Sequence, residues 1–570
     1  MRPPDDPPLS PIDAVVLALT IALAGAIRAW HLGGPSLWWD EIVHVQSAAG
    51  PGFADVWRAV REGIPPGLGN AGAVPLDYLF LHVWMRLVAP PDPTGLEIYY
   101  RLPSLLWNTA AVAATFLWAR RFLDSTIAGL AALLLALSVP HALYAVEARS
   151  YSLFSLTTVL QLWAFSSLVV RLVRHQRGGW IAFTCLAGLL FLSGLPGLFL
   201  LTAQYSILGV LALRELARGE GTPGTRARPA IALAISAAAV ATLVILYYWD
   251  TVWWASYGRG RELAVQPLTE HALRTFAYRS PTLFRCFLGA LPLTLWLGWR
   301  RGDGRFAIAL YLAVSFLAIP ALILLAQGKD YYFHFRHALF LLPHFVLVTA
   351  TGLAVALRAV LPKSLWAGPP KRRKMVIGLL GAGVIAVLQG PVVAAYLRRP
   401  EPFFAETKTV RDLRTLMLRL RERFAALAPG EKYVLITERR RPGHIANPSL
   451  AEYLEWYGLT DRVVLRGTDD PEGTLRDLTS SCEEGCRGRE LLSLPTAFGL
   501  PAPFGLRPEL KELLEVSPTE VTSHDRLGGV GVIYWERLTF RPPRRFAGYD
   551  VASFSGLTWY DLRIFPPSPP

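Results

Sequence analysis

Two adjacent acids, Asp40 and Glu41, lie in the stretch GPSLWWDEIVHVQS (34–47), soon after an apolar run long enough to cross a membrane. A carboxylate at a membrane surface is either a solvated side chain or part of a site. In a site, it can act as a general base that removes the proton of an acceptor hydroxyl or amine. The acids alone do not decide between the two interpretations, so the other charged groups expected on the same side matter.

Charged side chains recur in two later turns between apolar runs, residues 141–151 and 327–337. Cationic groups at such positions can hold the phosphate of a lipid-linked donor and stabilise it as it leaves. The isoprenoid tail of that donor would lie between helices, which is a physical reason for a membrane-bound reaction. The candidate donor-binding residues are Glu147, Arg149, Lys329, His334 and Arg336.

Each of these features also has a structural interpretation. Adjacent acids in a loop are more often solvated than catalytic, and Glu147 with Arg149 could form an interfacial ion pair of little energetic weight. The tryptophans before Asp40 and the aromatic residues around His334 are typical of an interfacial belt. The convergence of acids and cations on one side favours a site.

The elements that would position these residues follow from composition. The chain has 570 residues, 52% of them hydrophobic, and apolar runs of roughly 18–22 residues recur through about the first 400 positions. This pattern predicts an all-α polytopic membrane protein with about eleven transmembrane helices, the first of them uncleaved. The expected spans are 12–30, 99–118, 126–144, 152–173, 180–195, 197–213, 229–249, 283–298, 306–326, 337–357 and 375–397.

The formal net charge of +14 is interpreted as a signal of membrane topology, that is, of which loops face the cytoplasm. In a soluble protein it would suggest nucleic acid, but here the arginines and lysines concentrate in short loops, so no nucleic-acid partner is predicted. With a cytoplasmic N-terminus, every strongly basic loop falls on the cytoplasmic side. Segment 75–88 is too short to cross and is expected as an interfacial or re-entrant helix of the first extracytoplasmic loop, 31–98. If this segment crossed the membrane, every later helix would have the opposite orientation, and the basic loops would no longer all lie on the cytoplasmic side.

The C-terminal part has the composition of a soluble domain. Strands are predicted at 432–437 and 462–467, with a helix at 449–458 between them, which indicates an α/β domain. The predicted domains are therefore a transmembrane domain, 1–397, and an extracytoplasmic domain, 398–570.

Two cysteines, Cys482 and Cys486, stand close together in the predicted extracytoplasmic domain. Their spacing leaves two alternatives open, a small disulfide loop in an oxidising compartment or two free thiols. Because no second Cys or Cys/His pair is near, no metal site is predicted. No cofactor is predicted either, although a divalent metal would be compatible with phosphate chemistry.

Five segments carry recognisable motifs in a fixed order over roughly residues 1–400. They are GPSLWWDEIVHVQS with the preceding Arg28 (L-W-x-D-E), AVPLDYLFLHVW (73–84; H-P-P-L-x-Y), YYRLPSLLWNTAAV (99–112; R-x-P-S), YAVEARSYSL (144–153; Q-x-A-R-x-Y-x-L) and YFHFRHALFLLP (332–343; R-Y-x-x-x-x-x-P). This ordered set resembles the motifs of membrane glycosyltransferases with the GT-C fold, in particular the protein O-mannosyltransferase-like group and the aminoarabinose–lipid A transferases.

The resemblance implies roles for individual residues. Asp40 matches the catalytic acid of the first loop, the general base, and Glu41 matches a neighbour that orients acceptor or donor. Glu147 falls at the second acidic position of the fold, with Arg149 in the same turn. Arg336 matches a late arginine expected to contact the donor phosphate.

Two departures from the motifs suggest a divergent donor or acceptor. Ala73 and Val74 precede Pro75 where the family has H-P-P, and His337 follows Arg336 where it has tyrosine. The resemblance still implies a function: inverting transfer of a hexosyl or pentosyl group from a polyprenyl-phosphate sugar to a glycan, lipid or protein of the cell envelope. The active site would face the periplasm from a multi-pass protein of the plasma (inner) membrane. The alternatives are a transporter or lipid flippase, a non-catalytic scaffold, and an inactive family member.

Overall fold

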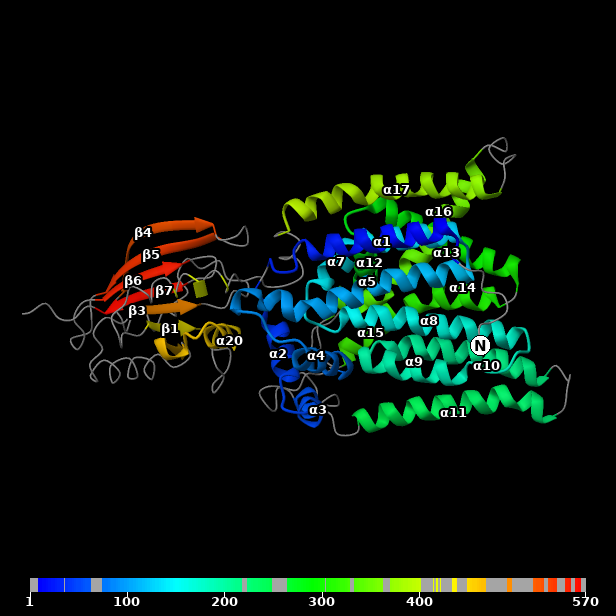
Figure 1. Ribbon diagram of the computed structural model, residues 1–570, viewed down its shortest axis with the longest axis horizontal. Helices are drawn as coiled ribbons and strands as arrows, with labels where there is room; N and C mark the ends of the chain where they lie inside the picture. Colours follow the sequence, from blue (N-terminus) through cyan, green and yellow to red (C-terminus); the bar gives the residue numbers. More distant parts are fainter. Residues whose placement is uncertain are drawn as a thin grey trace, which may run out of the picture. The chain divides into compact units, whose positions relative to one another are not determined.

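The computed structural model describes residues 9–34, 36–62, 74–217, 223–248, 264–302, 304–328, 333–361 and 370–400, and shorter segments between 414 and 564. The chain divides into two compact units (Figure 1). We call Met1–Leu32, Val43–Pro90 and Ile98–Arg398 the membrane unit. Gly33–Ile42, Pro91–Glu97 and Arg399–Pro570 form the C-terminal unit, which therefore includes two pieces of the first loop.

Helices build the membrane unit, and the first loop adds η1 and the starts of α2 and α5, which belong to the C-terminal unit. Within the described residues, nine helices are long and apolar enough to cross a membrane, and the number is ten if one bent pair of helices is a single span. In chain order, with η for 3₁₀ helices, the elements are α1 (Pro11–Ala29), α2 (Trp39–Ala48), α3 (Phe53–Glu62), α4 (Leu76–Leu87), η1 (Pro93–Gly95), α5 (Leu96–Phe122), α6 (Ser125–Ala136), α7 (Val139–Ala145), α8 (Tyr151–Val173), α9 (Trp180–Ser193), α10 (Gly197–Ala217), α11 (Pro223–Tyr248), α12 (Val265–Phe276), α13 (Pro281–Arg301), α14 (Arg305–Val314), η3 (Ser315–Leu317), α15 (Ala318–Gly328), η4 (Phe335–Leu341), α16 (Leu342–Val360) and α17 (Pro370–Arg398).

All eleven predicted spans are helical, which confirms a polytopic helical membrane protein. Two of them differ in detail from a simple crossing. The span predicted at 126–144 is the bent pair α6 and α7, whose axes meet at 59°. The span predicted at 180–195 is α9, whose 14 residues fall below the usual spanning length. The short segment 75–88 forms the 12-residue helix α4.

Burial distinguishes central from peripheral helices. Of the apolar stretch that includes α16, 89% is buried, and α16 packs against α6 and α13. Only 17% of the corresponding stretch of α11 is buried, and this helix contacts α9 and α10. Large apolar side chains such as Ile235 and Leu246 are exposed along α11, as expected of a surface that faces lipid.

Polar contacts tie helix ends together at each end of the bundle. At one end, the C-termini of α1 and α17 meet, where the indole N–H of Trp30 donates to the Leu397 carbonyl at 3.2 Å. At the other end, Asp124 before α6 pairs with Arg358 of α16 at 2.8 Å. We call these the motif end and the basic end. Arg358 belongs to one of the basic loops that the sequence predicts on the cytoplasmic side.

A mixed seven-stranded sheet forms the described core of the C-terminal unit, in the order β2-β1-β3-β7-β6-β5-β4. Strand β1 is parallel to β2 and β3, and the other pairs are antiparallel. Helix α20 supplies the crossover that a parallel pair needs between β1 and β2. The elements are β1 (Tyr433–Thr437), α20 (Pro448–Trp456), η6 (Thr460–Arg462), β2 (Val463–Gly467), β3 (Glu490–Leu494), β4 (Val516–Arg526), β5 (Val532–Phe540), β6 (Tyr549–Phe554) and β7 (Trp559–Ile564).

The sheet confirms the predicted α/β character of this region. The expected strands at 432–437 and 462–467 are β1 and β2, and the expected helix at 449–458 is α20. Cys482 and Cys486 lie outside the described residues.

Candidate active site

The break between α6 and α7 is held by a buried arginine. Pro140 has no N–H to donate to the carbonyl of Ala136, so α6 cannot continue as a regular helix. Arg28 replaces the missing donor: its guanidinium donates to the Ala136 and Leu135 carbonyls, both at 3.0 Å. The Arg28 side chain is wholly buried. The arginine at the end of the first helix thus stabilises the bend that leads into the next motif.

Asn108 of α5 completes this support. Its side-chain oxygen accepts from the Nε–H of Arg28, and its Nδ2 donates to the His141 carbonyl at 3.0 Å. The same Nδ2 lies 3.3 Å from Oγ of Ser152 in α8. One amide therefore links α1, α7 and α8. Sequence reasoning gave Asn108 no role, although an amide inside an apolar run was a signal.

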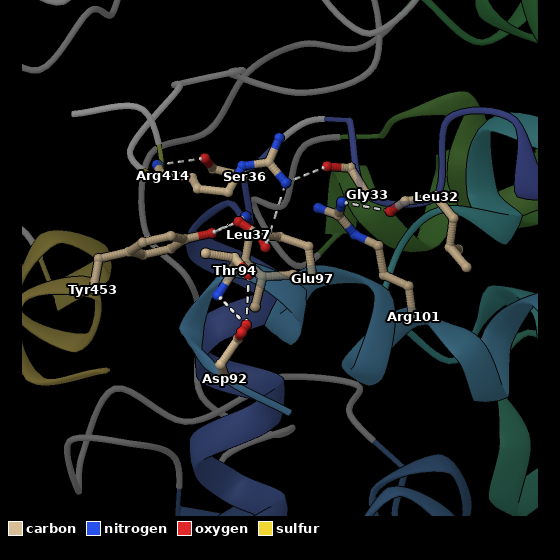
Figure 2. A network of polar contacts seen from close by, with 10 residues as sticks. All are labelled: Leu32, Gly33, Ser36, Leu37, Asp92, Thr94, Glu97, Arg101, Arg414 and Tyr453. Carbon is tan, nitrogen blue, oxygen red and sulfur yellow. Dashed lines mark hydrogen bonds and ion pairs between the residues drawn. The ribbon is translucent and has the colours of Figure 1, made fainter. Parts of the chain in front are cut away.

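The R-x-P-S segment of α5 fastens two other motifs. Arg101 is wholly buried and donates to the Leu32 carbonyl at 3.1 Å (Figure 2). Oγ of Ser104, one turn later, donates to the Arg149 carbonyl at 3.4 Å. At i, i+3 and i+7, Arg101, Ser104 and Asn108 share one face of α5. This face positions the linker after α1 and the turn before α8.

Glu147 and Arg149 lie in the turn that joins α7 to α8. The Arg149 N–H donates to the Glu147 carbonyl at 2.8 Å, which makes the turn tight. The Glu147 side chain is 1% exposed, and Arg149 is half-buried. The structure therefore brings together two of the predicted donor-binding residues in one turn.

His334 caps η4 through its imidazole. Its Nδ1 accepts the Arg336 N–H at 3.2 Å, and the His334 N–H donates to Nδ1 of His337 at 3.3 Å. Burial, together with the positive charges of Arg336 and His271, lowers the pKa of His334 from 6.5 to about 4. The ring is neutral at physiological pH, so it offers hydrogen bonds and not a charge.

The turn before α8 and η4 converge at the motif end. Helix α8 packs against η4. The rings of Tyr144 and Phe335 also pack edge to face, with centroids 6.1 Å apart. The turn that carries Arg149 and the 3₁₀ helix that carries Arg336 therefore lie close together. The predicted binding residue Lys329 lies outside the described residues.

Asp40 and Glu41 occupy the first turn of α2, where the helix dipole favours carboxylates. Oε2 of Glu41 accepts the Trp38 N–H at 3.2 Å, and the side chain is wholly buried. Asp40 is half-buried. Glu41 therefore caps the helix, while Asp40 is partly exposed.

The later part of α2 is anchored within the membrane unit. Nε2 of His44 lies 2.9 Å from Oδ2 of Asp77 in α4, and the Tyr78 ring lies 3.8 Å from the His44 ring. His82 of α4 contacts the Ala48 carbonyl through Nδ1 at 2.9 Å. These contacts fasten α2 to α4. Within the described part of the chain, no three His, Cys, Asp or Glu side chains are grouped to hold a metal.

A pocket at the basic end is separate from these residues. Apolar side chains line most of it, and Arg301 and Arg305 contribute the charged groups. It lies where α5 ends and α14 begins, whereas the motif residues gather around the start of α5 and of α8. The pocket is therefore not part of the candidate site.

No protein-family model and no curated protein sequence match the chain. The crystal structure of ArnT from Cupriavidus metallidurans bound to undecaprenyl phosphate is similar over 98% of this chain and 100% of that chain, with a TM-score of 0.51 and 14% identity. Apo ArnT from the same organism covers 84% of this chain and 93% of its own, with a TM-score of 0.48 and 14% identity. Archaeoglobus fulgidus AglB, an archaeal oligosaccharyltransferase in complex with an inhibitory peptide and a dolichol-phosphate, covers 85% and 69%, with a TM-score of 0.48 and 11% identity. The likeness to undecaprenyl-phosphate-bound ArnT shows that this chain has the GT-C fold of membrane glycosyltransferases, as its ordered motifs predicted.

Proposed function

We propose that this protein is an integral membrane glycosyltransferase that uses a polyprenyl-phosphate-linked sugar. The observation that carries the proposal is that the turn with Arg149 and the 3₁₀ helix with Arg336 lie together at the motif end, where α8 packs against η4 and the Tyr144 ring contacts Phe335. Guanidinium groups bind phosphate oxygens through paired, charge-assisted hydrogen bonds. The undecaprenyl phosphate bound to ArnT, which has the same fold, supports a lipid phosphate as the ligand.

In the proposed reaction, an acceptor hydroxyl or amine attacks the anomeric carbon of the donor sugar. Asp40 takes the proton of the attacking group, and the bond from the anomeric carbon to the phosphate oxygen breaks. The products are the glycosylated acceptor, free polyprenyl phosphate and a protonated Asp40, which returns its proton to water. Attack opposite the leaving group inverts the configuration at the anomeric carbon.

The remaining residues have supporting roles in this proposal. Arg149 and Arg336 neutralise the charge that develops on the leaving phosphate. The buried Glu147 carboxylate orients Arg149, the cation of its turn, and the neutral His334 ring donates a hydrogen bond through Nε2. Lys329 stays a donor-binding candidate from the sequence alone. Glu41 holds the first turn of α2 and so orients its neighbour.

The multi-pass chain lies in a membrane, and we place its motif end on the extracytoplasmic side. The concentration of arginine and lysine in the loops of the basic end supports this orientation through the positive-inside rule. The acceptor is then a glycan, lipid or protein of the cell envelope, and the membrane is the plasma (inner) membrane of a bacterium.

The test is sugar transfer by purified protein in nanodiscs, supplied with a panel of radiolabelled polyprenyl-phosphate sugars. We expect Asp40→Asn to lower turnover by about 10²- to 10⁴-fold while donor binding is retained, because the amide cannot take a proton. Asp55→Asn is the matched control, since Asp55 is a surface acid of α3 paired with Arg58 at 3.5 Å.

The outcomes separate the candidate functions. Sugar-dependent turnover by the wild type that is lost only in Asp40→Asn supports the proposed reaction and base. Full activity of a folded Asp40→Asn variant would contradict the base. If the wild type consumes none of the donors but moves labelled lipid across a vesicle bilayer, the protein is a flippase.

A further inference from the structure

The linker before Asp40 is held by residues from the C-terminal part of the chain. The hydroxyl of Tyr453 in α20 accepts the Leu37 N–H at 2.8 Å (Figure 2). Arg414 donates its N–H to Oγ of Ser36 at 3.0 Å and its guanidinium to the Gly33 carbonyl at 2.8 Å. Two of these hydrogen bonds hold backbone groups, those of Gly33 and Leu37, and the third holds the Ser36 side chain.

Glu97 connects the two holding residues. Its Oε1 accepts the Tyr453 hydroxyl proton at 2.8 Å, and its Oε2 lies 3.8 Å from the Arg414 guanidinium (Figure 2). Tyr453, Glu97 and Leu37 are each 1% exposed. A buried carboxylate needs such partners, so the loss of one leaves the others poorly satisfied. All of these residues belong to the C-terminal unit.

Helix α2 passes from one unit to the other directly after the catalytic candidate. Its first turn, with Asp40, belongs to the C-terminal unit, and the helix joins the membrane unit at Val43. On the near side, Leu37 is held by Tyr453, three residues before Asp40. On the far side, His44 is held by Asp77, four residues after it. Asp40 therefore lies in the chain between two residues that are held by side chains, Leu37 and His44.

We propose that Tyr453, Arg414 and Glu97 are positioning residues through which the C-terminal unit sets the geometry of the general base. The inference rests on the proposed function, in which Asp40 takes the acceptor proton. Proton transfer requires hydrogen-bond reach, and a displacement of about 1 Å can cost about 10²-fold in rate.

Tyr453→Phe tests the inference, because it keeps the ring and removes both hydrogen bonds of the hydroxyl. We expect turnover to fall about 10- to 100-fold, with the donor KM and donor binding unchanged. Ser36→Ala is a second and milder variant, which removes the acceptor of the Arg414 N–H. It should fold even if Tyr453→Phe does not, and should lower turnover in the same way.

Two controls separate positioning from general damage. Glu455→Gln changes an exposed residue of the same helix, α20. Tyr205→Phe removes a tyrosine hydroxyl that contacts Oγ of Ser236 at 2.8 Å in the membrane unit. Both controls should keep wild-type turnover. The apparent Tm of every variant is measured alongside. A lower turnover supports the positioning role when the variant has the Tm of the wild type.

The failures of the two proposals are distinguishable. If Asp40→Asn is inactive while Tyr453→Phe and Ser36→Ala keep wild-type turnover, the linker does not position the base and the proposed function stands. If the two variants weaken donor binding and leave turnover unchanged, the inference is also wrong. If Asp40→Asn is fully active, the proposed function fails and the inference falls with it.

Discussion

Asp40 and Glu41 are neighbours in the sequence, but their surroundings differ. Glu41 is wholly buried and accepts the Trp38 N–H, whereas Asp40 is half-buried. A general base must reach an acceptor that comes from outside, so the accessible acid is the better candidate. The sequence pair DE could not reveal this division, because each side chain's burial depends on contacts made far away in the chain.

His334 is the residue for which a pH effect can be argued. Its pKa of about 4 in the folded protein compares with 6.5 for an ordinary histidine. Between these two values, the unfolded chain binds a proton that the folded protein does not, so acid favours unfolding. The stabilising contribution is fully present above about pH 6.5 and decreases as the pH falls towards 4.

The variant His334→Asn should reduce this acid sensitivity. Asparagine keeps a side-chain acceptor for the Arg336 N–H but does not titrate. We expect the apparent Tm of the variant to fall less than that of the wild type between about pH 7 and about pH 5. Thermal unfolding in detergent at both pH values measures the difference. An equal fall in the two proteins would show that His334 titrates normally.

At the scale of elements, the spans were predictable and the joints between them were not. About twenty apolar residues are a strong signal, and all eleven expected spans are helical. The break inside 126–144 was not predicted, although Pro140 marks it. A proline within a long apolar run is compatible with a kink or a break, and only the contact with Arg28 selects between them.

Arg28 should be essential for the stability of this break. In the described structure its guanidinium has five hydrogen-bond partners, and none is a carboxylate. They are the Ala24, Leu135 and Ala136 carbonyls, the Asn108 side-chain oxygen and Nδ1 of His141. Arg28→Met leaves these buried acceptors without their donor, at a cost on the order of 3 kcal/mol. We expect a lower apparent Tm by several degrees.

The control for this variant is Arg300→Met. Arg300 is an exposed arginine that lies over the Trp296 ring at 4.5 Å, so its loss should leave the Tm almost unchanged. Thermal unfolding of the three proteins in the same detergent makes the comparison. A wild-type Tm for Arg28→Met would mean that the freed carbonyls find other donors.

At the scale of the whole molecule, the two compact units do not coincide with continuous stretches of sequence. Residues 33–42 and 91–97 of the first loop group with residues after Arg398. Composition identifies a soluble domain from about 398 onward, but hydrogen bonds to backbone groups such as the Leu37 N–H leave no pattern in the sequence. The motifs located the candidate residues, and the structure was needed to find what holds them.

The proposed orientation predicts which surfaces a reagent can reach. In a variant without the four native cysteines, Gln176→Cys lies in the exposed turn after α8, and Glu455→Cys lies on exposed α20. A membrane-impermeant maleimide applied to intact spheroplasts should label Glu455→Cys and spare Gln176→Cys. Labelling after membrane disruption is the control for reactivity. Labelling of Gln176→Cys alone would reverse the orientation.

The hydrogen bond between Leu37 and Tyr453 also constrains biosynthesis. The two residues are 416 positions apart, so the ribosome adds Tyr453 roughly 20 to 80 s after Leu37 at ordinary rates of translation. During that interval the segment with Asp40 lacks its anchor, although the early helices are already being inserted. A nascent or prematurely terminated chain would therefore lack this support for its acid, and it would transfer sugar more slowly than a chain that contains Tyr453.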